Sequence, residues 1–403
     1  MKTVAIISEY NPFHSGHLYQ IRRIREDFGE DTRIVAIMSG NYTQRGHIAM
    51  MDKSARAKTA VLCGANLVLE LPFPYSMGSA EIFAKAGVAI AEGIGQIDVL
   101  SFGSECGDLS LLKETAERMQ RKEFIRKMKE ISEANPALGH AELSEEALAY
   151  YIGSAAAKEI LRPNNILALE YIKALKALKS PIEPHTVSRS GADYRAEQLD
   201  EEKAHQSASA IREAILAGND SAMDYIPKEA KEVVLSQIQD LAAPCREEAL
   251  SAAILSYFRL NRPSASCRFQ DAKGGLYNRL ITKSYEATDI SSLAALTETK
   301  KFTNARIRRA IWYSFFGVTS SDVKSTPAFT RVLALDKEGR AILHAARASA
   351  KIQIVTKPSE QLSTPQGERC KALADRADAV FQLTKPAKTS GSFAMRNSPF
   401  FKK

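Results

Sequence analysis

The chain has 403 residues, with hydrophobic and charged contents of 45% and 25% that are ordinary for globular proteins. This length predicts two or three domains, and the composition excludes a chain that is disordered throughout. The net charge of +8 is moderately basic. It fits either a cytosolic enzyme with spare lysines or a protein that binds phosphates.

Cysteine usage and hydrophobicity indicate the compartment. The five cysteines are scattered and contain no CxxC pair, which argues against a disulfide framework and a zinc ribbon. The apolar residues 4–7 are too few, and too soon followed by Glu9, for a signal peptide. No uninterrupted apolar stretch reaches the roughly 20 residues of a membrane helix. We therefore expect a cytoplasmic protein without membrane association.

Short β-branched runs alternate with segments of helical periodicity in the first part of the chain. We expect strands at residues 2–7, 33–38, 66–71, 98–102 and 181–187, and helices at 14–28, 52–63, 78–93 and from about 207. This alternation predicts βαβ units with right-handed crossovers, and thus an α/β fold with a Rossmann-like parallel sheet. Leu- and Ala-rich helical periodicity fills much of the stretch between the fourth and fifth strands.

Three regions follow from this pattern. Residues 1–220 form the parallel-sheet domain, with a helical insertion at about 108–160. Residues 221–385 are expected to form a mostly α-helical, basic domain. Residues 386–403 are polar and punctuated by Gly and Ser, so we expect a flexible tail.

A motif at the first strand-to-helix junction carries the chemistry. The first strand leads into His14-Ser15-Gly16-His17, two histidines that bracket a glycine. Gly16 lets a nucleotide approach the backbone, and the helix start offers unpaired N–H groups to an anion. His14 and His17 can both donate to phosphates and stabilise the charge that develops on the α-phosphate during adenylyl transfer. Two plain surface histidines are the alternative, but the strand before and the helix after favour a nucleotide site.

A family resemblance becomes clear from several blocks together. These are EYNPFHSGH, MSGNYTQRG (38–46), LELPFPYSMGSAEIFAKAGV (69–88), LSFGSE (100–105), RPNNILALEYIKAL (162–175), VSRSGADY (187–194), SASAIR (207–212), GLYNRL (275–280) and KFTNARIRRAIWY (301–313). Over about residues 1–345 the chain resembles the bacterial tRNA(Met) cytidine acetate ligases, which have the fold of HIGH-motif nucleotidyltransferases. The last fifty residues match weakly.

The resemblance implies an activity and its partners. Such enzymes join acetate to ATP, with Mg²⁺, and transfer the acetyl group to the exocyclic amine of the wobble cytidine of elongator tRNA(Met), which gives N4-acetylcytidine. Residues 1–220 would then be the ATP-binding catalytic domain and residues 221–385 the tRNA-binding domain. We expect no stable protein partner. We also expect no metal site built from protein side chains, although Glu9 or Glu105 could hold Mg²⁺ through water.

The resemblance also implies which residues bind ATP, with His14 and His17 as the catalytic pair. The expected ATP-binding residues are Ile7, Ser8, Glu9, Tyr10, Asn11, Pro12, Phe13, His14, Ser15, Gly16, His17, Leu18, Tyr19, Gln20, Gly103, Asn164, Asn165 and Arg189. General chemistry is compatible with this set. Gly103 follows a parallel strand, where ligands of open α/β sheets bind. An asparagine can pair with an adenine or ribose edge, and Arg189 can donate bidentately to phosphate.

Two further segments have an ordinary and a functional interpretation. Ser207 and Ser209 fit plain N-caps, while Arg212 would reach the β- and γ-phosphates as the basic residue of related serine-rich segments. The family's typical threonine is absent here, which leaves a hydroxyl contact in doubt. The loop 41–46 is either a plain loop or one whose side chains contact acetate, the acceptor base or phosphate.

Arg306, Arg308 and Arg309, with Phe302, Trp312 and nearby lysines, form the strongest basic cluster. A solvated helix face is its ordinary explanation. Basic groups interleaved with aromatic ones also suit RNA, and the resemblance favours tRNA binding by these arginines.

Two other functions stay open. A small-molecule nucleotidyltransferase would use the same motif, but it predicts a chain of about half this length without a basic helical extension. A non-catalytic RNA-binding factor that kept a nucleotide-binding fold would tolerate replacement of His14 and His17.

Overall fold

The computed structural model describes residues 1–136, 138–188, 206–263, 267–392 and 398–403. Their strands are β1 (Thr3–Ser8), β2 (Arg33–Ser39), β3 (Leu67–Leu71), β4 (Val99–Ser104), β5 (Glu183–Ser188), β6 (Phe329–Leu335), β7 (Gln353–Val355) and β8 (Phe400–Phe401). Within these ranges the eight strands form one sheet in the order β5-β4-β1-β2-β3-β6-β7, and β8 pairs with β6.

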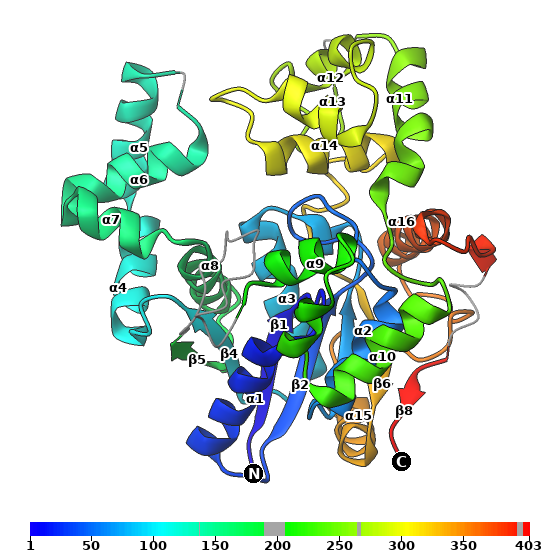
Figure 1. Cartoon of the computed structure of the whole chain (residues 1–403). Helices are drawn as coiled ribbons and strands as arrows, with labels where there is room; N and C mark the ends of the chain where they lie inside the picture. The colour runs from blue at the N-terminus through cyan, green and yellow to red at the C-terminus, as the bar shows by residue number, and fades with distance from the viewer. Residues whose placement is uncertain (137, 189–205, 264–266, 393–397) are drawn as a thin grey trace.

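The first five strands confirm the predicted α/β fold. β1 pairs in parallel with β2 and β4, β2 with β3, and β4 with β5. Because these strands are parallel, their carboxyl ends meet at one edge of the sheet. Figure 1 shows that β1 runs from the N-terminus toward the helices α11–α14, so this edge faces them.

Both faces of the sheet are covered, which explains why the strands are continuous apolar runs. Val4 and Ile6 belong to one core cluster, whereas Ala5 between them belongs to another. The same alternation repeats in β2, where Val35 and Ile37 lie on the face opposite to that of Ala36.

Helices from distant parts of the chain cover each face. One core cluster takes side chains from α1 (Ser15–Phe28), α2 (Lys53–Leu62), α9 (Ala208–Leu216) and α10 (Lys228–Gln239). The other takes side chains from α3 (Ala80–Ile94), α8 (Pro163–Ala177) and α15 (Lys337–Ser349). In Figure 1, α1, α9 and α10 lie in front of the sheet.

Two helical regions extend from the sheet on the side of its carboxyl edge. The first is an arm formed by α4 (Leu109–Gln120), α5 (Lys122–Ala134), α6 (His140–Ile152) and α7 (Ser154–Ile160), where the sequence predicts a helical insertion. The second, called the helical lobe below, contains α11 (Ser251–Leu260), α12 (Leu276–Ser284), α13 (Ile290–Thr297) and α14 (Asn304–Phe316). Figure 1 shows the arm and the lobe on different sides of the molecule.

The chain after the lobe differs from the sequence prediction. Instead of continuing as helices to residue 385, it returns to the sheet, where β6 pairs antiparallel with β3 and in parallel with β7. The helix α16 (Pro365–Phe381) follows, and β8 then pairs with β6 inside the segment expected to be a flexible tail. The physical reason is the edge of β3, which would otherwise expose unpaired backbone groups.

Short 3-10 turns complete the secondary structure: η1 (Tyr75–Met77), η2 (Asp220–Tyr225), η3 (Glu247–Leu250) and η4 (Gln382–Thr384). Within the ranges given above, no helix has both the length and the apolar character needed to span a membrane.

Candidate functional site

The turn between β1 and α1 is almost fully buried. Tyr10, Asn11, Phe13 and His14 are each at most 2% exposed, and Tyr10 takes a left-handed φ of 46°. The Tyr10 ring lies 4.9 Å from the rings of both Phe13 and His17, measured between centroids. The packing holds the turn in one conformation, and burial raises the pKa of the Tyr10 hydroxyl well above its usual range.

The two histidines form a reciprocal cap at the start of α1. His14 Nδ1 accepts a hydrogen bond from Gly16 N (3.1 Å), and His17 Nδ1 accepts one from His14 N (3.2 Å). A neutral imidazole that accepts at Nδ1 carries its hydrogen on Nε2, so these bonds assign the Nε2–H tautomer to both rings. The ring centroids are 3.9 Å apart. The cap therefore places two N–H donors side by side at a helix N-terminus.

Gly16 makes room for this arrangement. A Cβ atom at this position would lie 2.9 Å from His14 Cε1 and 3.1 Å from His14 Nδ1. The glycine therefore allows the His14 ring to fold back over the helix start, in addition to the close backbone approach that the sequence predicts.

A cleft of about 840 Å³, including its open mouth, surrounds the turn. It is lined by Ile7, Ser8, Glu9, Tyr10, Asn11, His14, His17, Gln20, Gln44, Phe83, Phe102, Gly103, Asn164, Leu167, Tyr171 and Ala208. The cleft lies at the carboxyl ends of β1 and β4, where open α/β sheets bind ligands.

The carboxylate of Glu105, which follows β4, connects β4 to the start of α8 in one wall of the cleft. Glu105 accepts hydrogen bonds from the backbone N–H of Asn164 (3.1 Å) and of Asn165 (2.8 Å) and from Asn164 Nδ2 (2.7 Å). Asn165 Oδ1 accepts from the N–H groups of Glu105 and Cys106, while its Nδ2 donates to the Glu159 carbonyl. The fully buried Asn165 therefore supports the wall, whereas Asn164 lines the cleft itself.

The start of α9 lies against the same turn. Ser207 is its N-cap, since its Oγ accepts from Ala210 N at 3.0 Å. Arg212 donates to the Asn11 carbonyl at 2.8 Å and to Ser209 Oγ at 3.0 Å. The guanidinium is thus held beside the turn that carries the histidines.

A buried arginine links this turn to the neighbouring loop. Arg56 is inaccessible to solvent and donates to the carbonyls of Glu9, Gly40 and Met51. Burial lowers the pKa of its guanidinium to about 10. Arg56 could not be identified from the sequence, because a basic residue in an Ala- and Lys-rich helix gives no signal of a buried position.

The structure brings most of the predicted ATP-binding residues together. Those in the cleft lining are Ile7, Ser8, Glu9, Tyr10, Asn11, His14, His17, Gln20, Gly103 and Asn164. The predicted residues outside the lining, as far as the chain is described, are Pro12, Phe13, Ser15, Gly16, Leu18, Tyr19, Asn165 and Arg212. Arg189 lies outside the described residues. The ATP contacts of all these residues stay predictions.

Several lining residues carry no sequence signal. Phe102, Leu167 and Tyr171 are apolar side chains of β4 and α8 that resemble ordinary core residues in sequence. Gln44, by contrast, comes from the loop 41–46 after β2, for which the sequence leaves two interpretations open: a plain loop, or a loop whose side chains contact acetate, the acceptor base or phosphate. Only the fold places these side chains in one cleft.

The three predicted tRNA-binding arginines form ion pairs or hydrogen bonds with other residues of the chain. Arg308, only 8% exposed, forms an ion pair with Glu247, and Arg309 Nε lies 2.5 Å from Asp271 Oδ2. Arg306 donates to the carbonyls of Asp271 and Lys273. Their contact with tRNA stays a prediction, and the contacts within the chain give all three a structural role.

The aromatic residues of that cluster are also internal. Trp312 is fully buried and donates from Nε1 to the Gly46 carbonyl at 2.8 Å, and Phe302 is 7% exposed. The sequence pattern of alternating basic and aromatic residues here reflects the packing of α14 against the loop 41–46.

The family of the chain follows from its similarity to known proteins. The family model described as HIGH Nucleotidyl Transferase matches residues 1–395, so the chain belongs to this family. Within it, the tRNA(Met) cytidine acetate ligase of Acetivibrio thermocellus is 32% identical over 372 residues, which are 89% of each chain. That of a Thermoanaerobacter species is 35% identical over 366 residues, which are 89% of this chain and 90% of the relative. The chain is therefore a member of the tRNA(Met) cytidine acetate ligase family.

A solved structure extends the similarity to the whole fold. The crystal structure of Thermotoga maritima TmcAL bound with alpha-thio ATP is 27% identical to this chain, covers all of both chains and superposes with a TM-score of 0.91.

Proposed function

We propose that this protein is an ATP-dependent ligase that acetylates the wobble cytidine of elongator tRNA(Met). The observation that carries the proposal is the pair of imidazole Nε2–H donors that the cap holds at the start of α1, in a chain of this family. The ATP analogue bound by the similar TmcAL structure supports ATP as the nucleotide.

The first step is activation of acetate. A carboxylate oxygen of acetate attacks the α-phosphorus of ATP, the bond from that phosphorus to the bridging oxygen breaks, and pyrophosphate leaves with its electron pair. Negative charge builds on the phosphate oxygens in the transition state. The positioned N–H donors of His14 and His17 stabilise the transition state, in which this charge develops, more than they stabilise the ground state. Arg212 adds a positive charge beside the turn.

The second step consumes acetyl-adenylate. The exocyclic N4 of cytidine attacks the acetyl carbonyl carbon, the carbon–oxygen bond to the phosphate breaks, AMP leaves, and the amine nitrogen loses a proton. The products are N4-acetylcytidine and AMP.

Mg²⁺ would bind together with ATP, through its phosphate oxygens. In the described ranges, no group of three or more His, Cys, Asp or Glu side chains is arranged to hold a metal ion. Mg²⁺ usually keeps several waters and binds through phosphate oxygens with one or two carboxylates. Glu9, in the cleft lining, is a carboxylate that could hold one of these waters.

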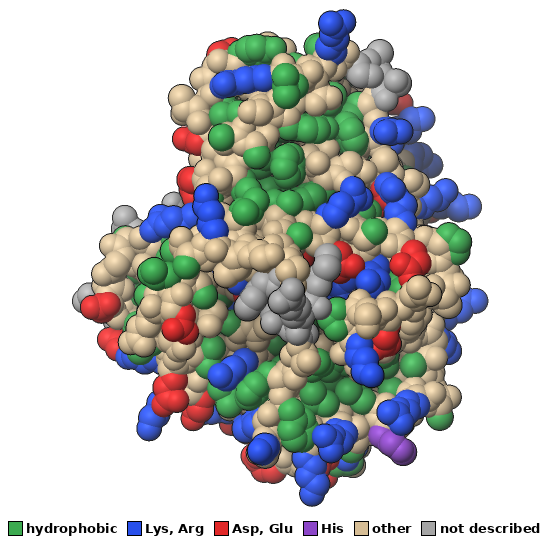
Figure 2. Space-filling view, turned by 90° about the vertical axis from the view of Figure 1, so that its right-hand side faces the viewer, with side chains coloured by type: hydrophobic (Ala, Val, Ile, Leu, Met, Phe, Trp, Pro, Cys, Tyr) green, Lys and Arg blue, Asp and Glu red, His purple; other side chains and the backbone are tan. Residues whose placement is uncertain are grey.

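The tRNA would reach the cleft from the carboxyl edge of the sheet. This edge faces the helical lobe, and the arm of α4–α7 extends beside it (Figure 1). The net charge of +8 favours a polyanion. Figure 2 shows Lys and Arg side chains along the junction between the lobe and the lower part of the molecule. A cytoplasmic location is expected for an enzyme with this substrate.

The test is product analysis. The purified protein is incubated with ATP, Mg²⁺, acetate and unmodified elongator tRNA(Met), and the tRNA nucleosides are then analysed by mass spectrometry. We expect N4-acetylcytidine that depends on both ATP and acetate. Binding of ATP without formation of this nucleoside would contradict the proposal and would favour a non-catalytic RNA-binding factor.

A further inference from the structure

The cleft has three zones because of the strand order. β1 lies between β4 and β2 in the sheet, so the turn with the histidines lies in the middle. On the β4 side, Phe102, Leu167 and Tyr171 form a largely apolar wall. On the β2 side, the lining includes Gln44 and the Glu9 carboxylate that accepts a hydrogen bond from Gln44 N.

Each zone suits one part of the adenylation reaction. A flat heterocycle such as adenine gains most from the apolar wall on the β4 side. The phosphates require the helix start, the paired imidazoles and Arg212 in the middle. The zone that remains for the third reactant, a carboxylate that attacks the α-phosphorus, is the β2 side with Gln44.

The loop that carries Gln44 is held in place at its centre and at its end. Gln44 N donates to Glu9 Oε1 at 2.8 Å, and Trp312 Nε1 donates to the Gly46 carbonyl at 2.8 Å. A Cβ atom at Gly46 would lie 2.4 Å from Arg308 Cβ, so the loop lies directly against α14.

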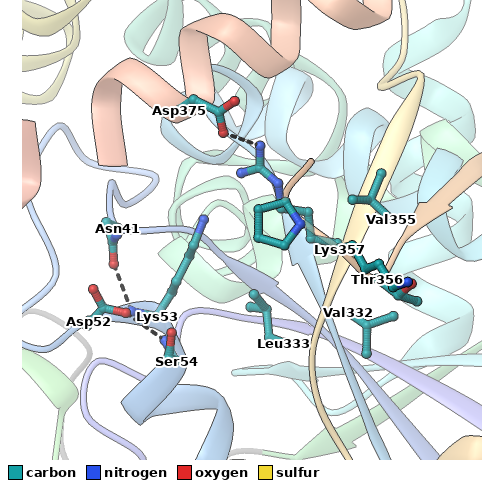
Figure 3. Close-up of a pocket in the computed structure, with 12 residues that line it drawn as sticks. Asn41, Asp52, Lys53, Ser54, Val332, Leu333, Val355, Thr356, Lys357 and Asp375 are labelled. Carbon is teal, nitrogen blue, oxygen red and sulfur yellow. Dashed lines mark hydrogen bonds and ion pairs between the residues drawn. The ribbon is translucent and has the colours of Figure 1, made fainter. Parts of the chain in front are cut away.

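The beginning of the loop is anchored by a buried polar cluster. Asn41 Oδ1 accepts from Lys53 N at 2.7 Å, and Asn41 Nδ2 donates to Asp378 Oδ1 at 2.9 Å. Figure 3 shows Asn41 bonded to Lys53 in this region. Arg331 forms an ion pair with Asp375 from α16. With all these contacts in place, Gln44 can meet a ligand at little cost in loop entropy.

We propose that the side-chain amide of Gln44 binds the carboxylate of the acyl donor and directs it at the α-phosphorus. The amide is a neutral donor, so it holds one carboxylate oxygen without neutralising the charge that makes the other oxygen nucleophilic. The guanidinium of Arg56, bonded to the Glu9 carbonyl, offsets the negative charge of the Glu9 carboxylate on this side of the cleft. This proposal rests on the proposed function, because it names the residue that binds its carboxylate substrate.

The chain offers a matched control. Gln20 lines the same cleft but lies on the β4 side, where its Nε2 donates to the Ser101 carbonyl at 3.4 Å. Gln44 and Gln20 are therefore side chains of one type on opposite sides of the turn. Replacing each one should affect the binding of a different substrate.

The experiment measures acetate-dependent exchange of labelled pyrophosphate into ATP, without tRNA. Gln44→Ala should raise the KM for acetate by about tenfold or more and change the KM for ATP by less than about threefold, since a hydrogen bond to a charged group is lost. Gln20→Ala should raise the KM for ATP and leave that for acetate nearly unchanged. Gln44→Met, which keeps length but lacks donors, should behave like Gln44→Ala and covers the case in which the alanine variant does not fold.

The outcomes separate the two proposals. Equal changes in both KM values for the Gln44 variants, or no change in the KM for acetate, would overturn the assignment of Gln44 and leave the proposed function intact. Absence of acetate-dependent exchange in the unaltered protein would overturn the proposed function itself.

Discussion

At the residue scale, the two histidines act as a pair because their ring centroids lie 3.9 Å apart at the start of α1. The spacing of His14, Gly16 and His17 after a strand predicts a nucleotide site at a helix start, and the structure places both imidazoles in a cleft at that point. The direction of their hydrogen bonds could not be predicted. It depends on the reciprocal cap, in which each Nδ1 accepts from a backbone N–H group.

Gly16→Ala tests this geometry. A methyl group 2.9 Å from His14 Cε1 would push the imidazole out of its capping position. We expect adenylate formation to slow by about tenfold or more, whereas helix propensity itself favours alanine over glycine by about 1 kcal/mol. Initial rates of pyrophosphate exchange and thermal melting check both effects. An unchanged rate would mean that the His14 ring position is unimportant.

Other residues could not be assigned from sequence for a physical reason. Arg308 and Trp312 have the composition of an RNA-binding surface, but burial is decided by tertiary packing. In the structure one pairs with Glu247 and the other holds the loop at Gly46. Gln44 differs from these two residues, because it lines the cleft although its loop can equally be a plain loop in sequence. Its place in the cleft depends on the distant elements that anchor this loop.

At the element scale, a buried charge cluster joins the loop after β2 to the C-terminal helix. Lys53 Nζ lies 2.6 Å from Glu70 Oε1 and 2.5 Å from Asp378 Oδ2, and Arg331 lies near both carboxylates. Burial, the largest effect, raises the pKa of Asp378 to about 6. Burial alone would also raise the pKa of Glu70, but Lys53 and Arg331 outweigh it and hold that pKa below its usual value.

Glu70→Gln should reveal the strength of this cluster. The change leaves Lys53 and Arg331 with one fewer buried carboxylate, so we expect a loss of about 3 kcal/mol of unfolding free energy near neutral pH. Because the folded-state pKa of Glu70 lies below 4.5, its stabilisation is fully present above that pH and is lost as the pH falls through the folded value. Urea unfolding at several pH values should show the difference from the unaltered protein shrink in acid. A difference that stays constant into acid would contradict an ionised Glu70.

At the scale of the whole molecule, the sheet is completed by the end of the chain. The alternation of strands and helices in the first half predicts the parallel core. It could not predict that β6 returns after the helical lobe to pair with β3, because that pairing joins segments more than 250 residues apart. Phe400 packs against the core cluster under α1 and α2 in a tail whose composition alone predicts flexibility. The division of the chain into catalytic and tRNA-binding domains stays a prediction.

Residues of the C-terminal half hold the loop beside the candidate catalytic cleft in position. The helical lobe fixes the loop of Gln44 through Trp312, and α16 fixes its start through Asp378. We infer that the half of the chain that carries the candidate cleft depends on the C-terminal half for the geometry of this cleft.

The most direct measurement of the central claim is acetate-dependent pyrophosphate exchange by the unaltered protein and by His14→Asn. Asparagine is a good N-cap, so the variant keeps the helix start but loses the imidazole donor. We predict exchange that requires acetate in the unaltered protein, a rate lower by about 100-fold or more in His14→Asn, and similar melting temperatures. Exchange at the unaltered rate in the variant, with its fold intact, would contradict the assignment of catalysis to the paired imidazoles.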